Sequence, residues 1–429
     1  MTRNLILFAA MAALILFEGV TGGWNSALGI LNMGLISAIM ALGVNMQWGY
    51  AGLFNSGIVG FVALGGLAPV LIATAPTPGA FQAGGWKILA ALLLAALVLI
   101  GATALYRRTG GRLRAVAMIA LLIAGFFAFR AVFDPAVAAI EAINPAAAGN
   151  LGGLGLPILL SWPVGALFAA LAAWGVGKTA LGLRSDYLAI ATLGIGEIII
   201  AVLKNEDWLA RGVKNIIGLP RPVPYEIDLQ ADPGFVANAA GLGLDPVTAS
   251  TLLVKFLYTG LFLVVLLGLI WLSEKALNSP WGRMMRAIRD NEIAAAAMGK
   301  HVTRRHLQIF ILGSAVCGLA GAMMITLDGQ MTPGSYNPLR FTFLIWVMVI
   351  VGGSGSNWGS VLGGMLIWFL WIKVEPWGNG LLHLITSGMA EGALKQHLLD
   401  SAAHMRLLTM GLILLLVLRF SPRGLIPEK

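Results

Sequence analysis

The sequence predicts an all-α integral membrane protein, a polytopic helical bundle with about 11–12 membrane segments. Its 429 residues are 58% hydrophobic and only 11% charged, and the mean hydropathy is +0.86. Soluble domains are about half apolar and about a quarter charged. Apolar runs that approach the roughly 20 residues of a membrane span recur along the chain. This composition excludes a soluble enzyme on a membrane anchor, a nucleotide-binding domain and a large ectodomain.

The expected membrane segments follow one another through mostly short polar connections. They lie at about 5–20, 27–46, 57–75, 87–106, 115–133, 157–176, 187–203, 250–272, 307–327, 340–351, 360–375 and 405–420. The tenth and eleventh runs are short, and the glycine-rich stretch Gly352–Gly359 separates them, which predicts two broken segments. Residues 76–156 are alanine-rich with few polar side chains, and we interpret them as a module added between core residues 1–75 and 157–429.

The distribution of Lys and Arg predicts the orientation in the membrane. With twelve crossings, more than half of the 28 Lys and Arg residues fall in loops on the side of both termini. The loop 273–306 is the most basic of these loops. Because basic loops stay inside, both termini are expected in the cytoplasm. The net charge of +9 is thus explained by orientation and does not predict a nucleic-acid partner.

No group of residues predicts catalysis, a metal site or a bound cofactor. The single cysteine, Cys317, lies within an apolar run, and the five histidines do not cluster with carboxylates. Gly177, Lys178 and Thr179 resemble the end of a phosphate-binding loop, but Ala172 stands where its first glycine is required. The chain is therefore expected to be a non-enzymatic component.

The most informative polar segment is 279–299, with the sequence SPWGRMMRAIRDNEIAAAAMG, in the loop 273–306. Ser279 and Pro280 predict a capped helix start, and Gly299 predicts its end. The side chains expected on one apolar stripe are Trp281, Met285, Ile288 and Ala295. Arg286 and Asp290 are spaced to form an ion pair. Such a helix either lies on anionic lipid headgroups or docks into a cytoplasmic partner.

Several separated segments resemble one family of transport proteins. Residues 292–299 resemble the Glu-Ala-Ala…Gly loop of ABC importer permeases, which couples to the ATPase subunit. The longer segment 279–323 closely resembles permeases of branched-chain amino acid ABC importers. Further segments with this resemblance are 32–66, 186–200, 352–365 and 421–427. The additional N-terminal spans resemble the longer, LivM-type permease. One departure is the external loop Ala210–Ile216, where the family usually has a glycine-rich sequence.

The resemblance implies an ATP-driven importer of branched-chain or related amino acids in a bacterial inner membrane. Its expected partners are a second homologous permease, two cytoplasmic ATP-binding subunits and an external solute-binding protein. The residues implied in coupling are Arg286, Arg289, Glu292, Ala295 and Gly299. The same architecture could move urea or short amides. An ion-coupled transporter is a less favoured alternative, and an integral-membrane enzyme is the least favoured.

Polar residues beside two chain breaks are candidates for the substrate pathway. They are Asn45, Gln47, Asn55 and Ser56 around the first break, and Ser356 and Asn357 in the second. Such residues at membrane depth face protein or a water-filled cavity. They can also cap the following helices, whose N-termini suit a carboxylate. The alternative interpretation is close helix packing, since Gly355, Gly359 and Gly363 recur every four residues.

Glu197 is a carboxylate inside the expected seventh span. Ionisable groups within a membrane are costly and usually functional. We predict a role in the pathway or in gating. The alternatives are a position close to the membrane surface or an ion pair with a basic residue such as Lys255.

Overall fold

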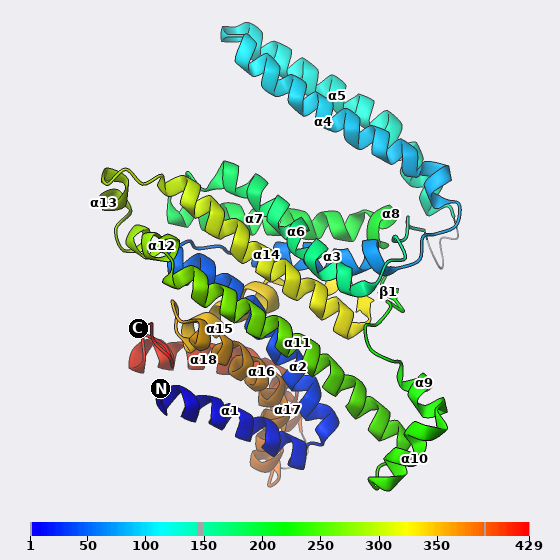
Figure 1. Ribbon diagram of the computed structural model, residues 1–429, viewed down its shortest axis with the longest axis vertical. Coiled ribbons are helices and arrows are strands. Elements are labelled where there is room, and N and C mark those ends of the chain that lie inside the picture. Colours follow the sequence, from blue (N-terminus) through cyan, green and yellow to red (C-terminus); the bar gives the residue numbers. More distant parts are fainter. Residues whose placement is uncertain (1, 144–148, 390–391, 429) are drawn as a thin grey trace.

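The computed structural model describes residues 2–143, 149–389 and 392–428, and it is an almost entirely helical bundle (Figure 1). The longer helices are α1 (Thr2–Thr21), α2 (Trp24–Ala51), α3 (Ile58–Ala73), α4 (Trp86–Arg108), α5 (Gly111–Glu141), α6 (Ser161–Ala180), α7 (Ser185–Asn205), α11 (Pro246–Asn278), α14 (Val302–Asp328), α15 (Leu344–Gly352), α16 (Asn357–Thr386) and α18 (Met405–Phe420).

Short elements connect these helices. The short α-helices are α8 (Asp207–Ala210), α9 (Glu226–Ala231), α10 (Pro233–Gly241), α12 (Pro280–Asp290), α13 (Glu292–Ala297) and α17 (Ala393–Asp400). Single turns of other helix types are η1 (Phe81–Gly85), η2 (Ile158–Leu160), η3 (Pro333–Ser335), η4 (Leu339–Phe343) and η5 (Ser401–His404). The strands β1 (Ile216–Ile217) and β2 (Gln330–Met331) pair antiparallel.

The helices occupy all of the apolar runs seen in the sequence. Among the described residues, eight helices are long and apolar enough to cross a membrane, or nine if the bent pair α17 and α18 is one span. The helix α3 and the η4–α15 segment are apolar but shorter, and α16 has 30 residues. The prediction of a polytopic helical membrane protein is therefore confirmed.

The centre of the bundle is formed by α2 and α14. In their most apolar windows, 83% of residues in α2 and 78% in α14 are buried, whereas the other six candidate spans reach 33% at most. Helices that are apolar all round are expected to be buried on all sides. Thus α2 and α14 are core helices, and the others present apolar side chains outward, toward lipid or partner chains.

Glycines allow α3, α6 and α14 to approach backbone to backbone. A Cβ atom at Gly65 of α3 would overlap the carbonyl group of Gly318 in α14, and one at Gly321 would overlap the carbonyl of Val62. Gly165 of α6 lies against the backbone of Gly65. In membranes, such small-residue contacts replace the hydrophobic driving force that holds soluble helices together.

The predicted break at the glycine-rich stretch is present, but the expectation of a short second segment is wrong, because α16 runs for 30 residues. The helix α15 ends at Gly352 and α16 begins at Asn357. The two helices pack so closely that a Cβ atom at Gly363 would overlap the carbonyl of Met348, and one at Gly352 the carbonyl of Gly359. Close packing is therefore what the glycines at this break provide.

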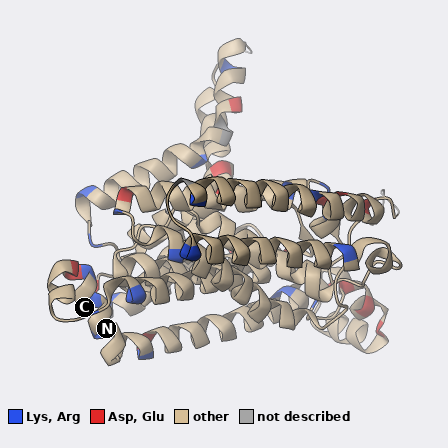
Figure 2. Cartoon of the chain, turned by 90° about the horizontal axis from the view of Figure 1, so that it is seen from above, with Lys and Arg blue, Asp and Glu red and all other residues tan. Residues whose placement is uncertain are grey.

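Both termini lie at the end of the bundle that carries α12 and α13, whereas α9 and α10 lie at the other end (Figure 1). The side chain of Arg3 donates a hydrogen bond to the carbonyl of Leu425 at 2.6 Å. This arrangement agrees with an even number of crossings. Figure 2 shows charged residues mainly toward the ends of the helices, with long uncharged stretches between them.

The helices α4 and α5 form a hairpin that projects away from the bundle (Figures 1 and 2). Only 17% and 6% of their most apolar windows are buried. At the base of the hairpin, Phe133 packs edge-on against Trp208 of α8, with ring centroids 5.8 Å apart. The two ends of the segment meet there, because Pro76 bridges to Gly152.

Candidate functional site

The helices α12 and α13 form the loop that the sequence predicts as a cytoplasmic coupling element. The Ser279 side chain caps α12 by accepting a hydrogen bond from the Gly282 N–H at 3.3 Å. The expectation of a single helix over 279–299 is wrong. The chain turns at Asn291, whose side chain accepts a hydrogen bond from the Ala294 N–H at 2.9 Å and so starts α13. Gly299 follows α13 with a φ of +76°, which favours glycine.

The apolar residues of this loop divide into a buried and an exposed group. Met285, Ile288 and Ala295 are buried, as the predicted stripe requires, and Ala295 packs with Ile288 against the start of α14. Ile293 and Met298 are instead 84% and 80% exposed. The large apolar side chains that this loop exposes are thus Ile293 in α13 and Met298 just after it, while Ala295 holds α13 in place.

Arg289 connects α12 to the core of the bundle. Its guanidinium donates to the carbonyl of Gly49 near the end of α2, and it forms an ion pair with Glu428 at 2.7 Å. Burial alone would lower the pKa of Arg289, but the hydrogen-bonded Glu428 carboxylate raises this pKa above its ordinary value. Arg289 therefore stays charged and ties three separate parts of the chain together.

The expected pair between Arg286 and Asp290 does not form. Asp290 pairs with its neighbour Arg289 at 3.2 Å. The Arg286 guanidinium donates a hydrogen bond to the carbonyl of Leu277 at 3.4 Å. Arg286 thus faces the end of α11 rather than the end of its own helix.

Glu292 is exposed at the start of α13 and borders two hollows. One is an open groove of about 760 Å³ beside α13. The other, of about 180 Å³, is also lined by Arg289 and His306. His306 is buried, and its Nε2 atom has no hydrogen-bond partner among the described residues. Sequence reasoning missed His306, because a lone histidine beside an apolar run carries no distinguishing pattern.

The segment 421–428 covers the break between α15 and α16. The N–H groups of Leu425 and Ile426 donate to the carbonyls of Val351 and Gly352 at 2.9 and 2.8 Å. These bonds satisfy backbone carbonyl groups in the last turn of α15, which have no N–H partner within the helix. Ile426 is buried. The segment therefore fixes Glu428 beside Arg289.

A first chain of buried polar groups joins α2, α11 and α16. The Gly355 N–H donates to the Asn45 side chain at 2.8 Å, and the Tyr50 hydroxyl donates to Asn357. The Asn357 amide in turn donates to the Glu274 carboxylate at 2.9 Å. Asn45, Tyr50 and Asn357 are buried. Tyr50 and Glu274 were not singled out from the sequence, because only the fold brings them to Asn357.

A second chain of polar groups surrounds the turn between α2 and α3. The Asn55 side chain donates to Gln47 at 2.9 Å, and Gln47 donates to Ser314 of α14 at 2.9 Å. The Ser56 N–H donates to the Thr192 hydroxyl of α7 at 3.1 Å. The hydrogen bonds of these predicted pathway residues are therefore made within the protein in this conformation.

The caps expected at the two breaks are partly confirmed. The Ser356 side chain caps α16 by accepting from the Gly359 N–H at 3.1 Å. At the first break, the Asn55 side chain accepts from the Gly57 N–H at 2.9 Å, one residue before α3. The first-turn N–H of Val59 is satisfied by Thr342 at 3.3 Å. The first break lies beside Arg289, and the second lies beside Glu428.

Glu197 lies apart from these networks. Its side chain is on the exposed face of α7, near the middle of the helix. The expected alternative partner, Lys255, instead donates to the carbonyl of Asn25 at 3.0 Å. A pathway or gating role for Glu197 stays a prediction.

The arrangement at this end of the bundle suits mechanical coupling. Two helix-connecting turns, the segment 421–428 and the loop helices meet around Arg289. Within the described part of the chain, no three His, Cys, Asp or Glu side chains are grouped as metal ligands. Through these contacts, a displacement of α12 can be transmitted to α2, α15 and α16.

We expect Asn357→Ala to lower the thermal unfolding midpoint of the detergent-purified protein. The change leaves the Tyr50 hydroxyl without its acceptor and the Glu274 carboxylate without the Asn357 donor. An unsatisfied buried polar group costs about 1–3 kcal/mol. The matched control is Asn205→Ala, which removes an exposed amide at the end of α7. Equal midpoints for both variants would contradict the importance of this network.

Comparisons with known proteins find permeases of transport systems. A family model described as branched-chain amino acid transport system / permease component matches residues 132–418, about two thirds of the chain. The high-affinity branched-chain amino acid transport system permease protein LivM of Escherichia coli strain K12 is 32% identical over 257 residues. This match spans 59% of the chain and 57% of the relative.

Two further relatives carry similar names. The LivM protein of Salmonella typhimurium is 31% identical over 257 residues, which are 59% of the chain and 57% of that relative. The probable branched-chain amino acid transport permease protein LivM of Methanocaldococcus jannaschii is 26% identical over 399 residues, which are 91% of the chain and 90% of that relative. No solved structure matches the chain.

Proposed function

The chain belongs to the family of permease components of branched-chain amino acid transport systems, and from this premise we propose that it forms the translocation subunit of an ATP-driven importer. The proposed solutes are branched-chain or related amino acids, as the names of its relatives suggest. The chain itself is proposed to be non-catalytic, with ATP bound and hydrolysed by partner subunits. The observation that carries the proposal is the contact of α12 with the core through Arg289.

In the proposed mechanism, two cytoplasmic ATPases bind the loop that holds α12 and α13. Their closure on ATP displaces α12, and Arg289 transmits this displacement to the end of α2 and to Glu428. The bundle thereby alternates between states open to either side. The exposed Ile293 and Met298, beside the open groove along α13, provide the apolar contact with the ATPase.

A second permease subunit is proposed to cover the outer face of α7. This face exposes Glu197 together with apolar side chains such as Ile190 and Ile198. A carboxylate facing lipid near the middle of a span is costly, so a protein partner is the more favourable neighbour. An external solute-binding protein is proposed to dock at the opposite end, on the segments around α9 and α10.

We expect Ile293→Asp to abolish co-purification of ATP hydrolysis with the tagged chain. A charge placed on a small apolar contact loses the burial energy and leaves a carboxylate to be desolvated. The measurement is ATPase activity of the complex purified in mild detergent, with leucine, urea or no solute. Leu242→Asp is the matched control, because Leu242 is similarly exposed at the opposite end. Unchanged hydrolysis in the Ile293 variant would contradict this docking surface.

Ala295→Trp tests the same loop in a different way. Ala295 is buried against Ile288 and Val302. The tryptophan side chain does not fit in this space, so it should displace α13 from its position. We expect co-purifying hydrolysis and solute uptake to fall together. If uptake and assembly both persist unchanged, the coupling role of this loop is wrong.

A further inference from the structure

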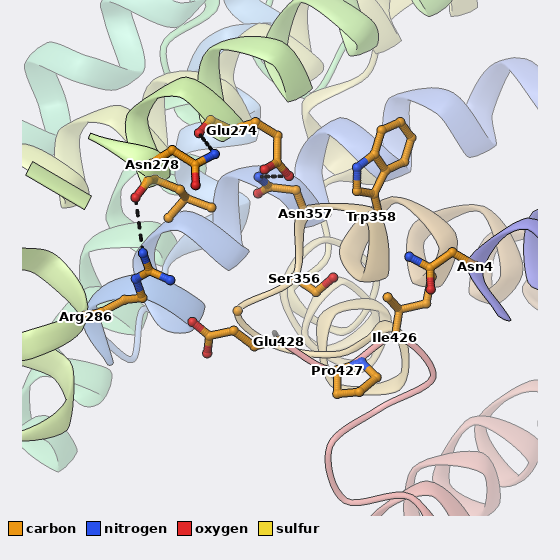
Figure 3. Close-up of a pocket in the computed structure, with 12 residues that line it drawn as sticks. Asn4, Glu274, Asn278, Arg286, Ser356, Asn357, Trp358, Ile426, Pro427 and Glu428 are labelled. Atoms are coloured by element: carbon orange, nitrogen blue, oxygen red, sulfur yellow. Dashed lines mark hydrogen bonds between the residues drawn. The ribbon is translucent and has the colours of Figure 1, made fainter. Parts of the chain in front are cut away.

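A polar pocket of about 340 Å³ lies where α11, α12, the start of α16 and the segment 421–428 meet. Small-molecule sites have volumes of roughly 300–1,000 Å³, so this pocket suits a small ligand. Asn4 and Glu428 line it, so it lies beside both termini, at the end of the bundle predicted to be cytoplasmic. Figure 3 shows its lining residues arranged around a central space.

The pocket contains opposite charges that do not neutralise each other. Glu274 and Arg286 both line it, and among the residues that the structure describes neither takes part in an ion pair. The Glu274 carboxylate accepts a hydrogen bond from the Asn357 amide at 2.9 Å. Arg286 is bonded to the Leu277 carbonyl at 3.4 Å. The third charge, Glu428, is already paired with Arg289 at 2.7 Å.

Apolar side chains complete the lining. Leu277, Trp358, Ile426 and Pro427 all border the pocket. In Figure 3, Arg286 lies on one side, and Trp358, Ile426 and Pro427 lie toward the other. A single cavity thus offers one cation, one uncompensated carboxylate and an apolar wall.

We propose that this pocket is a cytoplasmic binding site for a free amino acid with an apolar side chain. The ligand carboxylate binds Arg286, its ammonium group binds Glu274, and its side chain packs on Trp358 and Ile426. This proposal rests on the proposed function, because the ligand is the transported solute met at the exit side. An isolated cation or anion would leave one of the two protein charges without a partner, whereas a zwitterion satisfies both.

Because of where the pocket lies, a bound ligand affects the transport cycle. Its wall includes Arg286 of α12 and Glu428, which holds Arg289. A ligand bridging α11 and α12 therefore stabilises one placement of α12 over others. Accumulated cytoplasmic solute would then slow the ATP-driven cycle by favouring the occupied state.

The test is equilibrium binding to the purified importer complex in lipid nanodiscs, without ATP and without the external binding protein. The probes are leucine, leucine amide, which lacks the carboxylate, and 4-methylpentanoate, which lacks the ammonium group. The variants are Arg286→Gln and Glu274→Gln; the latter keeps an oxygen that can accept from Asn357. Arg283→Gln, an exposed position on α12 outside the pocket, is the matched control.

We expect each pocket variant to weaken leucine binding roughly tenfold or more, as loss of a charged hydrogen bond would. Arg286→Gln should leave leucine amide binding unchanged, and Glu274→Gln should leave 4-methylpentanoate binding unchanged. Leucine binding that neither variant weakens, or an equal loss of all three probes, overturns the assignment. Leucine import by the complete transporter is measured in parallel. If the complete transporter imports leucine but leucine does not bind at this pocket, only the pocket is rejected. If leucine is neither imported nor bound, the proposed function is rejected as well.

Discussion

Replacing Arg289 with glutamate should reduce solute import at least tenfold while the chain still assembles with its partners. The substitution places two carboxylates together and removes the donor to the Gly49 carbonyl. Exposed ion pairs contribute about 0.2–1 kcal/mol, and breaking a buried pair costs about 3–5 kcal/mol. With side chains 25% and 27% exposed, this pair lies between these limits. The bundle should therefore survive, but α12 loses its polar link to the end of α2 and to Glu428.

The readout is the ratio of solute imported to ATP hydrolysed in proteoliposomes. In the Arg289→Glu variant, ATP hydrolysis should continue while solute import falls, so the ratio of the two decreases. Combining the substitution with Glu428→Arg restores the ion pair but not the bond to Gly49, so import should recover only in part. Arg283→Glu, on the exposed side of α12, is the control. Import that remains coupled to hydrolysis in the Arg289 variant would exclude Arg289 as the link.

Gly65→Val should prevent stable folding of the chain. Any Cβ at this position overlaps the carbonyl of Gly318, so α3 and α14 must separate, and the contact with Gly165 of α6 is lost as well. Overpacking a tight core costs about 1–3 kcal/mol and occasionally more. Here the obstacle is backbone, which cannot rotate away, and we expect about 3 kcal/mol or more. The expected result is a large loss of monodisperse protein after detergent extraction.

The control for this change is Gly268→Val in α11, where a Cβ atom meets nothing within 4 Å. Both substitutions place the same β-branched residue inside a long helix, so the difference between them isolates the packing contact. Size-exclusion profiles and thermal midpoints are the measurements. Similar profiles for the two variants would mean that α3 and α14 tolerate separation.

Most of the fold could be predicted because membrane segments are encoded locally. Each apolar run became a helix, since a chain in lipid must satisfy its backbone internally. The basic loop 273–306 fixed the expected orientation, and Ser279 with Pro280 marked the start of α12. In the same way, a capping aspartate followed by proline starts α10 at Asp232 and α11 at Asp245.

The parts that could not be predicted depend on contacts between distant residues. The ion pair between Arg289 and Glu428 joins positions 139 residues apart, and no local pattern specifies it. The break at Asn291 was missed because asparagine there fits a helix face as well as a cap. The polar residues near the breaks stand out in the sequence, but a sequence does not reveal that Asn45 and Asn357 find partners within the protein.

The meeting of Pro76 and Gly152 at the base of the α4–α5 hairpin bears on how such chains can gain and lose length. The polypeptide leaves and re-enters the bundle at neighbouring points. The residues between these points could therefore be removed and the ends joined by a short linker, at little cost in loop-closure entropy. The excised piece contains two crossings, so every later segment would keep its sidedness. A subunit built in this way is modular in pairs of helices, and its length can vary without changing the side on which α12 and α13 lie.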